Sequence, residues 1–308
     1  MPKKIKLSEN IAKSLSVISI ASKSVRKKLT LNSKVIRKRV FTSTKPSIFS
    51  NLKRFINHPV VKTIGLNILT SNKKSSFSIY NHNICWTQSK ANHTRIAKKM
   101  QTLQPDIICL QEIVFQTQFK IFNLANYHRS IAPGSGKRVV RGGLAIYSKK
   151  MPLCVNFVKF IDQGKIFSPQ LAERRLEKGF LVAEFSDYLI INTHLVADQT
   201  KKWTELKLKH TNAQFEQLLN FIKETGDAKP IFIAGDLNFC PTNDSYQNAT
   251  QLDLVDLTSK IPYTYIDKEV KLDYIWTTKS NTEFKTRLVR FNYKEPSDHL
   301  AIYSQILI

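Results

Sequence analysis

Residues 105–112 read Pro-Asp-Ile-Ile-Cys-Leu-Gln-Glu, and they indicate the fold class more directly than any other stretch of the chain. The run Asp106–Leu110 is short and apolar, which is typical of a strand buried on both faces of a sheet. Pro105 ends the segment before it, Thr94–Leu103, where apolar residues recur on one side of a helix. The stretch therefore predicts a helix followed directly by an interior strand.

The same reasoning extends outward along the chain. Further strands are expected at Ser76–Ile84, Tyr127–Ile131, Gly143–Tyr147, Gly179–Phe185, Tyr188–Thr193, Pro230–Ala234, Leu272–Trp276 and Ala301–Leu307. Further helices are expected at Gln116–Leu124 and Glu205–Ile222. Some strands alternate with helices and others follow one another directly, which predicts an α/β fold with mixed sheets and flanking helices.

Composition sets the outer limits. The 308 residues are 42% hydrophobic, enough for one large core, and no run of 18 apolar residues predicts a transmembrane helix. The four cysteines include no Cys-x-x-Cys pair, which argues against a zinc site. We expect all four to be small buried apolar residues in a reducing compartment, namely Cys85, Cys109, Cys154 and Cys240.

The net charge of +25 suits a polyanionic partner, either nucleic acid or an anionic membrane surface, although a Lys-rich proteome would produce the same charge. Residues 1–60 contain 15 Lys and Arg and one acid, Glu9, and so carry +14. Residues 61–308 contain 33 Lys and Arg against 22 acids, and so carry +11. We therefore expect a basic N-terminal segment, 1–60, followed by a catalytic domain, 61–308, that is only moderately basic.

The N-terminal segment has one apolar helical face and a serine, Ser8, that could cap the helix; the face consists of Ile11, Leu15, Ile18, Val25 and Leu29. This pattern fits an organelle presequence, a membrane-surface helix, a nucleic-acid-binding arm or a solvated disordered tail. A secretory signal fits poorly, because the apolar run Leu15–Ala21 is short and interrupted by serines.

Polar residues gather where the expected strands end or begin. These residues are Asn81, His82 and Asn83; Gln111 and Glu112; Thr193 and His194; Asp236 and Asn238; Asp273; and Ser297, Asp298 and His299. Any one group has an ordinary explanation as a turn or a core hydrogen bond. Six such groups in one chain predict a shared pocket at the sheet edge, where ligands of sheet proteins often bind.

From Ser76 to Ile308 the sequence resembles the endonuclease/exonuclease/phosphatase superfamily. The resemblance rests on six motifs in the family's order: Tyr80-Asn81-His82-Asn83-Ile84, Pro105 to Glu112, Thr193-His194-Leu195, Gly235-Asp236-Leu237-Asn238, Leu272-Asp273-Tyr274-Ile275 and Ser297-Asp298-His299. It implies a four-layer sandwich of two packed mixed β-sheets flanked by helices. It also implies a metal-dependent phosphodiester hydrolase.

The resemblance implies a metal site with Glu112 as its anchor and Asn83 and Asp298 as further ligands. These are oxygen donors, which suit Mg²⁺, with Mn²⁺ as an alternative, better than Zn²⁺. Asn81 is a second candidate for the amide ligand, because alternation along a strand places it on the same face as Asn83. We favour Asn83, since Asn-Ile-x-Trp fits the family's pattern of an asparagine followed by an apolar residue.

The resemblance also implies roles in proton transfer. His299 would take a proton from water, and Asp273 would fix its tautomer and stabilise the imidazolium. Asp236 would orient or deprotonate the same water. Asn238 and His194 would bind the phosphoryl oxygens, and His194 would also protonate the leaving oxygen.

For the substrate we expect DNA or RNA, and a monomeric enzyme. The family's inositol-polyphosphate phosphatases usually have Cys-Asp-Arg where this chain has Leu272-Asp273-Tyr274, which counts against that branch. Its tyrosyl-DNA phosphodiesterases have Gly-Asp-Thr-Asn where this chain has Gly235-Asp236-Leu237-Asn238, which counts against that branch too. Basic loops at Lys137, Arg138 and Arg141 and at Arg174, Arg175 and Lys178 are candidates for phosphate contacts, or are simply solvated. A sphingomyelinase-like lipid phosphodiesterase is the first alternative, with Phe167 or Trp203 as apolar rim residues. The second alternative is a non-catalytic module that binds nucleic acid or membranes.

Overall fold

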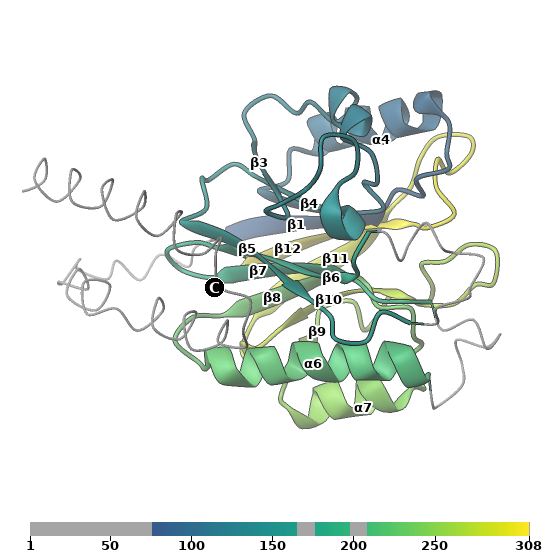
Figure 1. Cartoon of the computed structure of the whole chain (residues 1–308). Coiled ribbons are helices and arrows are strands. Elements are labelled where there is room, and N and C mark those ends of the chain that lie inside the picture. The colour runs from purple at the N-terminus through teal and green to yellow at the C-terminus, as the bar shows by residue number, and fades with distance from the viewer. Residues whose placement is uncertain (1–75, 165–175, 198–207, 308) are drawn as a thin grey trace, which may run out of the picture. The chain divides into compact units, whose positions relative to one another are not determined.

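Two six-stranded mixed sheets pack face to face in the computed structural model of the chain (Figure 1). The structure describes residues 76–164, 176–197 and 208–307, which all belong to one unit, Thr70–Ile308. The segment 1–60, its boundary at residue 61, and the residues Phe167, Arg174, Arg175 and Trp203 lie outside the described residues.

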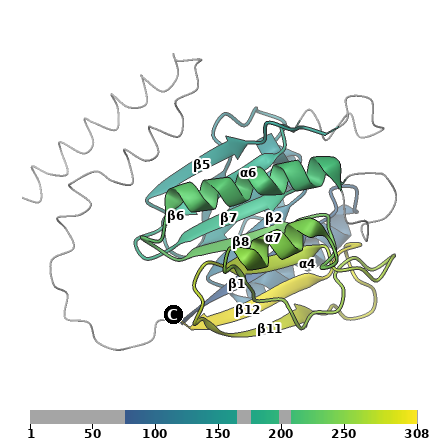
Figure 2. The same ribbon diagram turned by 90° about the horizontal axis from the view of Figure 1, so that it is seen from below.

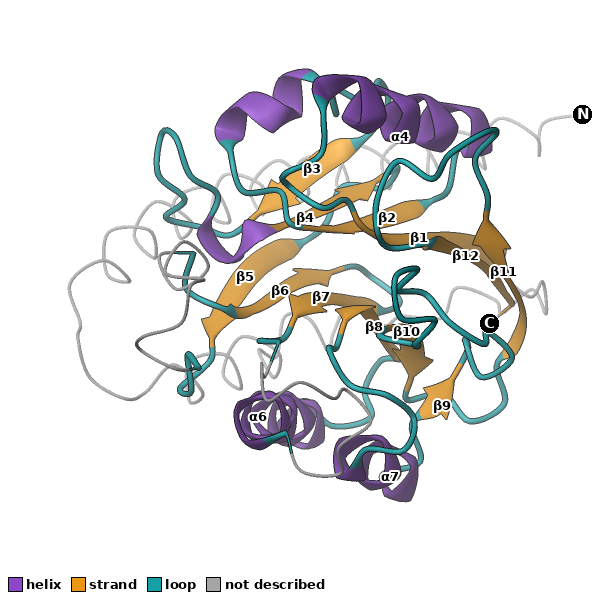
Figure 3. Ribbon diagram, turned by 90° about the vertical axis from the view of Figure 1, so that its right-hand side faces the viewer, coloured by secondary structure: helices purple, strands orange, loops and turns teal. Residues whose placement is uncertain are grey.

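The first sheet has the strand order β11-β12-β1-β2-β4-β3. Only β1 and β2 run parallel, and helix α4 (Lys90–Leu103) connects them and lies on the outer face of the sheet (Figure 3). The strands are β1 (Ser76–Asn83), β2 (Ile107–Gln111), β3 (His128–Ile131), β4 (Leu144–Ser148), β11 (Glu283–Val289) and β12 (Ala301–Leu307).

The second sheet repeats this plan, with the order β5-β6-β7-β8-β10-β9 and one parallel pair, β7 and β8. Helix α6 (Lys209–Thr225) connects that pair, and it lies with α7 (Asp244–Gln251) on the outer face of the sheet (Figure 2). The strands are β5 (Cys154–Lys159), β6 (Gly179–Glu184), β7 (Leu189–His194), β8 (Ile231–Asp236), β9 (Val255–Asp256) and β10 (Asp273–Thr277).

Strand β2 shows why the sequence folds into layers. Ile107 and Cys109 point into the core between the sheets, whereas Ile108 and Leu110 point into the core beneath α4. Successive side chains of a strand face opposite ways, so a continuous apolar run fills two cores at once. The four-layer sandwich predicted from the sequence is confirmed.

Some local expectations were wrong. Edge strand β11 was not predicted, because most of its residues are exposed and its sequence lacks an apolar run. Strands β5 and β9 and helix α7 were also missed, and Gln116–Leu124 contains only a short 3₁₀ helix, η1 (Gln116–Lys120). Cys109 and Cys240 are buried as expected, but Cys85 and Cys154 are only half-buried. No helix in the described residues is long and apolar enough to cross a membrane.

Candidate active site

Strand ends from both sheets meet at one edge of the sandwich. In the first sheet, Asn83 at the end of β1 pairs with Gln111 at the end of β2, and Glu112 follows directly. In the second sheet, Asp236 at the end of β8 pairs with His194 on one side and with Asp273 on the other. Strand register thus places the acids and amides from the sequence motifs side by side.

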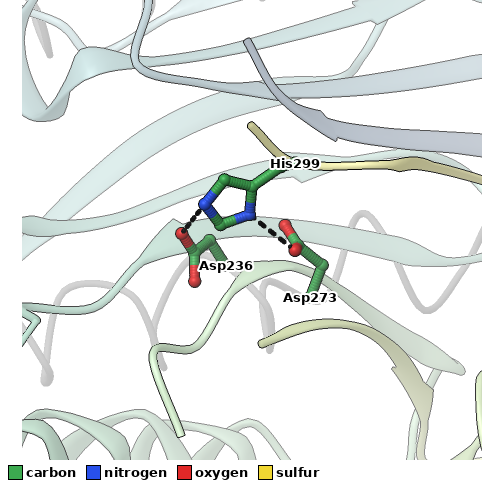
Figure 4. A group of neighbouring side chains, drawn as sticks. All are labelled: Asp236, Asp273 and His299. Carbon is green, nitrogen blue, oxygen red and sulfur yellow. Dashed lines mark hydrogen bonds and ion pairs between the residues drawn. The ribbon is translucent and has the colours of Figure 1, made fainter. Parts of the chain in front are cut away.

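His299 lies between two carboxylates (Figure 4). Its Nδ1 is 2.8 Å from Asp273 Oδ2, and its Nε2 is 3.7 Å from Asp236 Oδ2. The backbone of His299 is fixed by two contacts. Its N–H donates to Ser297 Oγ at 3.1 Å, and its carbonyl is 3.1 Å from His82 Nε2. All three side chains of the Asp273–His299–Asp236 chain are buried.

Asn83 joins this chain to Glu112. Its Nδ2 donates to Glu112 Oε1 and to Asp236 Oδ2, each at 3.0 Å. The other Glu112 oxygen, Oε2, accepts a hydrogen bond of 2.9 Å from the Trp86 backbone N–H. Because Asn83 belongs to the first sheet and Asp236 to the second, the amide connects the two halves of the site.

Two residues of the predicted site, Glu112 with φ 62° and Asn238 with φ 52°, have backbone angles in the left-handed region. This conformation is uncommon for Glu, and such residues cluster at functional sites. Nothing in the sequence signals it at Glu112. Gly235 also matters for the backbone, because a side chain there would overlap the Thr193 carbonyl and separate β7 from β8 next to Asp236.

Asp236 is the centre of the cluster. His194 Nε2 lies 3.6 Å from Asp236 Oδ2, and the Asn238 N–H donates to Asp236 Oδ1 at 3.0 Å. The Asn238 side chain instead donates to the Leu195 carbonyl at 3.0 Å. The structure thus brings His194 and Asn238 to Asp236, and it gives the Asn238 amide a backbone partner.

Burial and neighbouring charge shift the proton affinities. Burial raises the pKa of the Asp236 carboxyl, and Asp273 raises it further against the opposing effect of His299. Burial by itself lowers the pKa of His299, but the carboxylates of Asp273 and Asp236 outweigh it and raise that pKa above its usual range. Burial lowers the pKa of His194, and the nearby Lys178 ammonium lowers it further. The protonation of Asp236 and His299 is therefore set by their burial together with the charges of Asp236, Asp273 and His299 themselves.

The donor set fits a hard divalent cation. Asp298 Oδ1 lies 3.3 Å from Ser297 Oγ, which is also 2.8 Å from the Asn83 carbonyl, so Asp298 lies beside the end of β1 that carries Asn83. A second group, Asp236, Asp273 and His299, has ligand atoms within 4.8 Å of one another. Since carboxylate and amide oxygens are ligands that Mg²⁺ prefers, the residues present suit that ion.

Asn81 takes a different place from Asn83. Its Oδ1 accepts a hydrogen bond of 2.8 Å from Gln111 Nε2, which also donates to Asn192 Oδ1 at 2.7 Å. Asn192 in turn donates to the carbonyls of Leu110 and Ala145, so this network joins the sheets within the core. Asn83 alone of the two asparagines is bonded to Glu112. Asn192 was not predicted as a site residue, although an amide within the apolar run of β7 is a signal that could have identified it.

Two hydroxyl groups that position the site were also unassigned. Ser297 Oγ donates to the Asn83 carbonyl at 2.8 Å, which fixes the loop before β12 against the end of β1. Thr264 Oγ1 accepts from the N–H groups of Leu272 and Asp273, each at 3.0 Å. Ser297 lay within a recognised motif, whereas Thr264 lies in a turn that carried no signal.

A two-sheet sandwich with carboxylates, amides and imidazoles at one edge defines the class of protein. The chain belongs to the Endonuclease/Exonuclease/phosphatase family, whose model matches residues 80–299. Members of this family are generally hydrolases of phosphate esters and typically depend on a divalent metal. No curated protein matches the chain.

Several solved structures share the fold. D. rerio TDP2 complexed with a single-strand DNA product is similar at 17% identity and a TM-score of 0.58, covering 75% of this chain and 99% of that one. The human Nocturnin catalytic domain has 20% identity and a TM-score of 0.57, covering 77% and 98%. SmcL has 20% identity and a TM-score of 0.58, covering 75% and 99%. At these identities the likeness shows the fold alone.

Proposed function

We propose that this protein is a metal-dependent phosphodiesterase that hydrolyses DNA or RNA. The observation that carries the proposal is the continuous chain of contacts from Glu112 through Asn83 and Asp236 to His299 and Asp273. This arrangement combines an oxygen-rich site for a cation with a buried proton-transfer pair. Hydrolysis of an anionic ester requires both, because hydroxide is repelled by the substrate and the transition state gathers negative charge.

Glu112, Asn83 and Asp298 would hold the metal, Mg²⁺ or Mn²⁺. When bound, the ion would offset charge on the phosphoryl oxygens and stabilise the leaving oxygen. The Asn83 Nδ2 donor now lies between the carboxylates of Glu112 and Asp236. Turning that amide about its terminal bond would present an oxygen in the same place, as the proposed role requires, and would replace these two contacts and the 3.0 Å hydrogen bond that Asn83 Oδ1 accepts from the Cys85 N–H.

The group Asp236, Asp273 and His299 is better suited to moving a proton than to holding the ion. Its closest contact, 2.8 Å between His299 Nδ1 and Asp273 Oδ2, is a charge-assisted hydrogen bond that uses one atom of each residue. In our proposal the Asp236–His299 pair accepts the proton of the attacking water, and Asp273 positions the imidazole. His194 and Asn238, both beside Asp236, would bind the phosphoryl oxygens. His194 would also protonate the leaving oxygen, which requires the anionic substrate to raise the lowered pKa of its imidazole.

Charge supports a nucleic acid as the substrate. Residues 76–161 contain twelve Lys and Arg but only two acids, Asp106 and Glu112. Residues 162–308 contain 18 Lys and Arg and 20 acids. The part of the chain that contributes Glu112 is therefore strongly basic, which favours a polyphosphate backbone. One structural relative, TDP2 of D. rerio, is complexed with a single-strand DNA product.

A parallel assay tests the proposal. Single-stranded DNA, RNA, polyadenylate and sphingomyelin are each incubated with the full chain and Mg²⁺, with and without chelator, and with Glu112→Ala as the control. We expect hydrolysis of at least one nucleic acid, lost in chelator and in the variant. Turnover of sphingomyelin alone would replace the nuclease with a lipid phosphodiesterase. Binding without turnover of any of the four would leave a non-catalytic module.

A further inference from the structure

Two exposed aromatic side chains lie next to Glu112. Trp86 is 36% exposed and Phe115 is 41% exposed, and their ring centroids are 5.9 Å apart in an edge-to-face arrangement. Trp86 is fixed to the site by its backbone N–H, which donates to Glu112 Oε2 at 2.9 Å, and Phe115 follows Glu112 by three residues. The cation-binding side of the site therefore opens beside an aromatic surface that has no role in the chemistry proposed above.

A basic loop is joined to this aromatic pair. Phe115 forms a β-bridge with Val139, and the Gln116 N–H donates to the Arg138 carbonyl at 3.0 Å. Lys137 and Arg138 are exposed at the tip of that loop, and neither forms an ion pair within the described residues. Arg141 differs, because it is paired with Glu177 and stacks on Phe157. The loop thus presents two uncompensated cations next to the aromatic surface.

The basic character continues along the chain after Phe115. An open pocket of about 460 Å³ is lined by Gln116, Phe119, Lys120, Asn123 and Arg129. From Ile113 to Ile161 the sequence contains eight Lys and Arg and no acid at all. An anion that follows this surface away from Glu112 meets only neutral or positive side chains of that stretch.

We propose that Trp86 and Phe115 form a stacking platform for an unpaired base adjacent to the hydrolysed phosphodiester, and that Lys137 and Arg138 bind the flanking phosphates. The substrate is then single-stranded nucleic acid. This inference rests on the proposed function and names the substrate class of the same site. Aromatic rings beside a basic groove are the usual means of binding single strands, since every base has a face to stack.

A duplex fits this surface less well, because its bases already stack on one another and hide their faces. A lipid surface also fits less well. Membrane-inserting patches need a broad apolar face, whereas here the two rings are only partly exposed and have Lys, Arg and Gln as neighbours.

Binding of a fluorescein-labelled hexanucleotide, followed by anisotropy in chelator so that no turnover occurs, tests the inference. The variants are Trp86→Ala and Phe115→Ala, with Trp86→Phe as the aromatic-retaining form. Phe284→Ala on β11 is the matched control, since Phe284 is 38% exposed and lies outside the site. Each alanine should weaken binding at least about fivefold, because one base–aromatic stack contributes roughly that much or more. Trp86→Phe should restore most of the loss, and Phe284→Ala should bind like wild type.

An abasic series shows whether the lost contact is a stack on a base. Removing one base from the hexanucleotide should weaken wild-type binding at one position and have little further effect on Trp86→Ala. The salt dependence of binding should become shallower by about one unit of slope for Lys137→Ala and for Arg138→Ala, and should not change for Lys150→Ala beyond the far end of β4.

Several outcomes would overturn the inference: alanine variants that bind the hexanucleotide as wild type does, equal binding of a duplex hexamer, or loss of binding only to phosphatidylserine vesicles. The proposed function fails separately. If wild type binds the hexanucleotide through Trp86 but hydrolyses no phosphodiester with Mg²⁺, the stacking inference holds and the proposed hydrolase activity is wrong. If wild type hydrolyses DNA or RNA and the aromatic variants bind as wild type does, the proposed hydrolase activity holds and the stacking inference is wrong.

Discussion

The two sheets contribute unlike parts to one site. The first sheet supplies Asn83 and Glu112 within a strongly basic stretch, whereas the second supplies Asp236 and Asp273 within a stretch whose acids slightly outnumber its bases. Asn83 and His299 cross the junction, each with a hydrogen bond or close contact to an acid of the second sheet. The difference suggests a division of labour in which Glu112 and Asn83 of the first sheet hold the cation, whereas Asp236 and Asp273 of the second sheet govern the proton carried by His299.

The largest effect should follow from removing the charge on the first sheet's side. We predict that Glu112→Gln lowers kcat by roughly 1,000-fold or more, because loss of metal stabilisation costs several kcal/mol at the transition state. The amide keeps an oxygen for the Trp86 N–H, so the thermal melt should stay close to that of wild type. Chelator should reduce wild-type turnover to the same level. Turnover that survives chelator would show that the reaction does not depend on a metal ion.

The proton-transfer pair of Asp273 and His299 should fail as a unit. Asp273→Asn and His299→Ala should each reduce kcat by about 100- to 10,000-fold, the usual contribution of acid–base catalysis. The double variant should be little worse than the poorer single variant, since Asp273 acts only through His299. Steady-state kinetics of all four proteins on one substrate measures this coupling. Losses that multiply would show that the two residues work independently.

The amide network that joins the two sheets can be weakened at a residue that has no proposed catalytic or metal-binding role. Asn192→Ala should lower the free energy of unfolding by about 2–4 kcal/mol, because it removes three buried hydrogen bonds, two to the carbonyls of Leu110 and Ala145 and one from Gln111 Nε2. Chemical denaturation measures the loss, and Asn248→Ala on the exposed face of α7 is the control that should change little. Equal stability of the two variants would mean that the amide network does not hold the sheets together.

The smallest effect on chemistry is expected from residues 1–60. We propose that this segment, with +14 of the +25 charge, adds avidity or location rather than catalysis. Removing it should leave turnover of a short soluble substrate nearly unchanged and weaken binding to long nucleic acid or anionic vesicles, with a shallower salt dependence. The truncated protein must first show a normal melt. A normal melt with lost turnover would place the segment at the active site.

The sequence was most informative where a short run of residues determines the local structure by itself. Apolar runs such as Ile107–Leu110 and the polar residues that end them predicted both the layers and the edge where the site lies. Pairing between distant residues was harder to see. The bond of Asn83 to Asp236 spans 153 residues of sequence, and the inter-sheet amide of Asn192 had no motif to mark it.

Local conformation set a second limit on prediction. The left-handed backbone of Glu112 arises from its surroundings, where the Ile113 N–H donates to the Gly143 carbonyl, and not from its own preference. The exposed pair Trp86 and Phe115 was not recognised either, since each residue alone reads as an ordinary apolar position and only the fold places the rings 5.9 Å apart.

The most direct test of the division between the sheets is the affinity for the metal itself. Isothermal titration calorimetry with Mn²⁺ and Mg²⁺ would compare the full wild-type chain with Glu112→Gln and with Asp273→Asn. The account predicts that Glu112→Gln weakens metal binding by more than about tenfold, a lower bound set by the loss of supporting residues at metal sites, and that Asp273→Asn binds the ion nearly as wild type does. The reverse result, with binding lost in Asp273→Asn and kept in Glu112→Gln, would move the ion to the Asp236, Asp273 and His299 group and contradict the account.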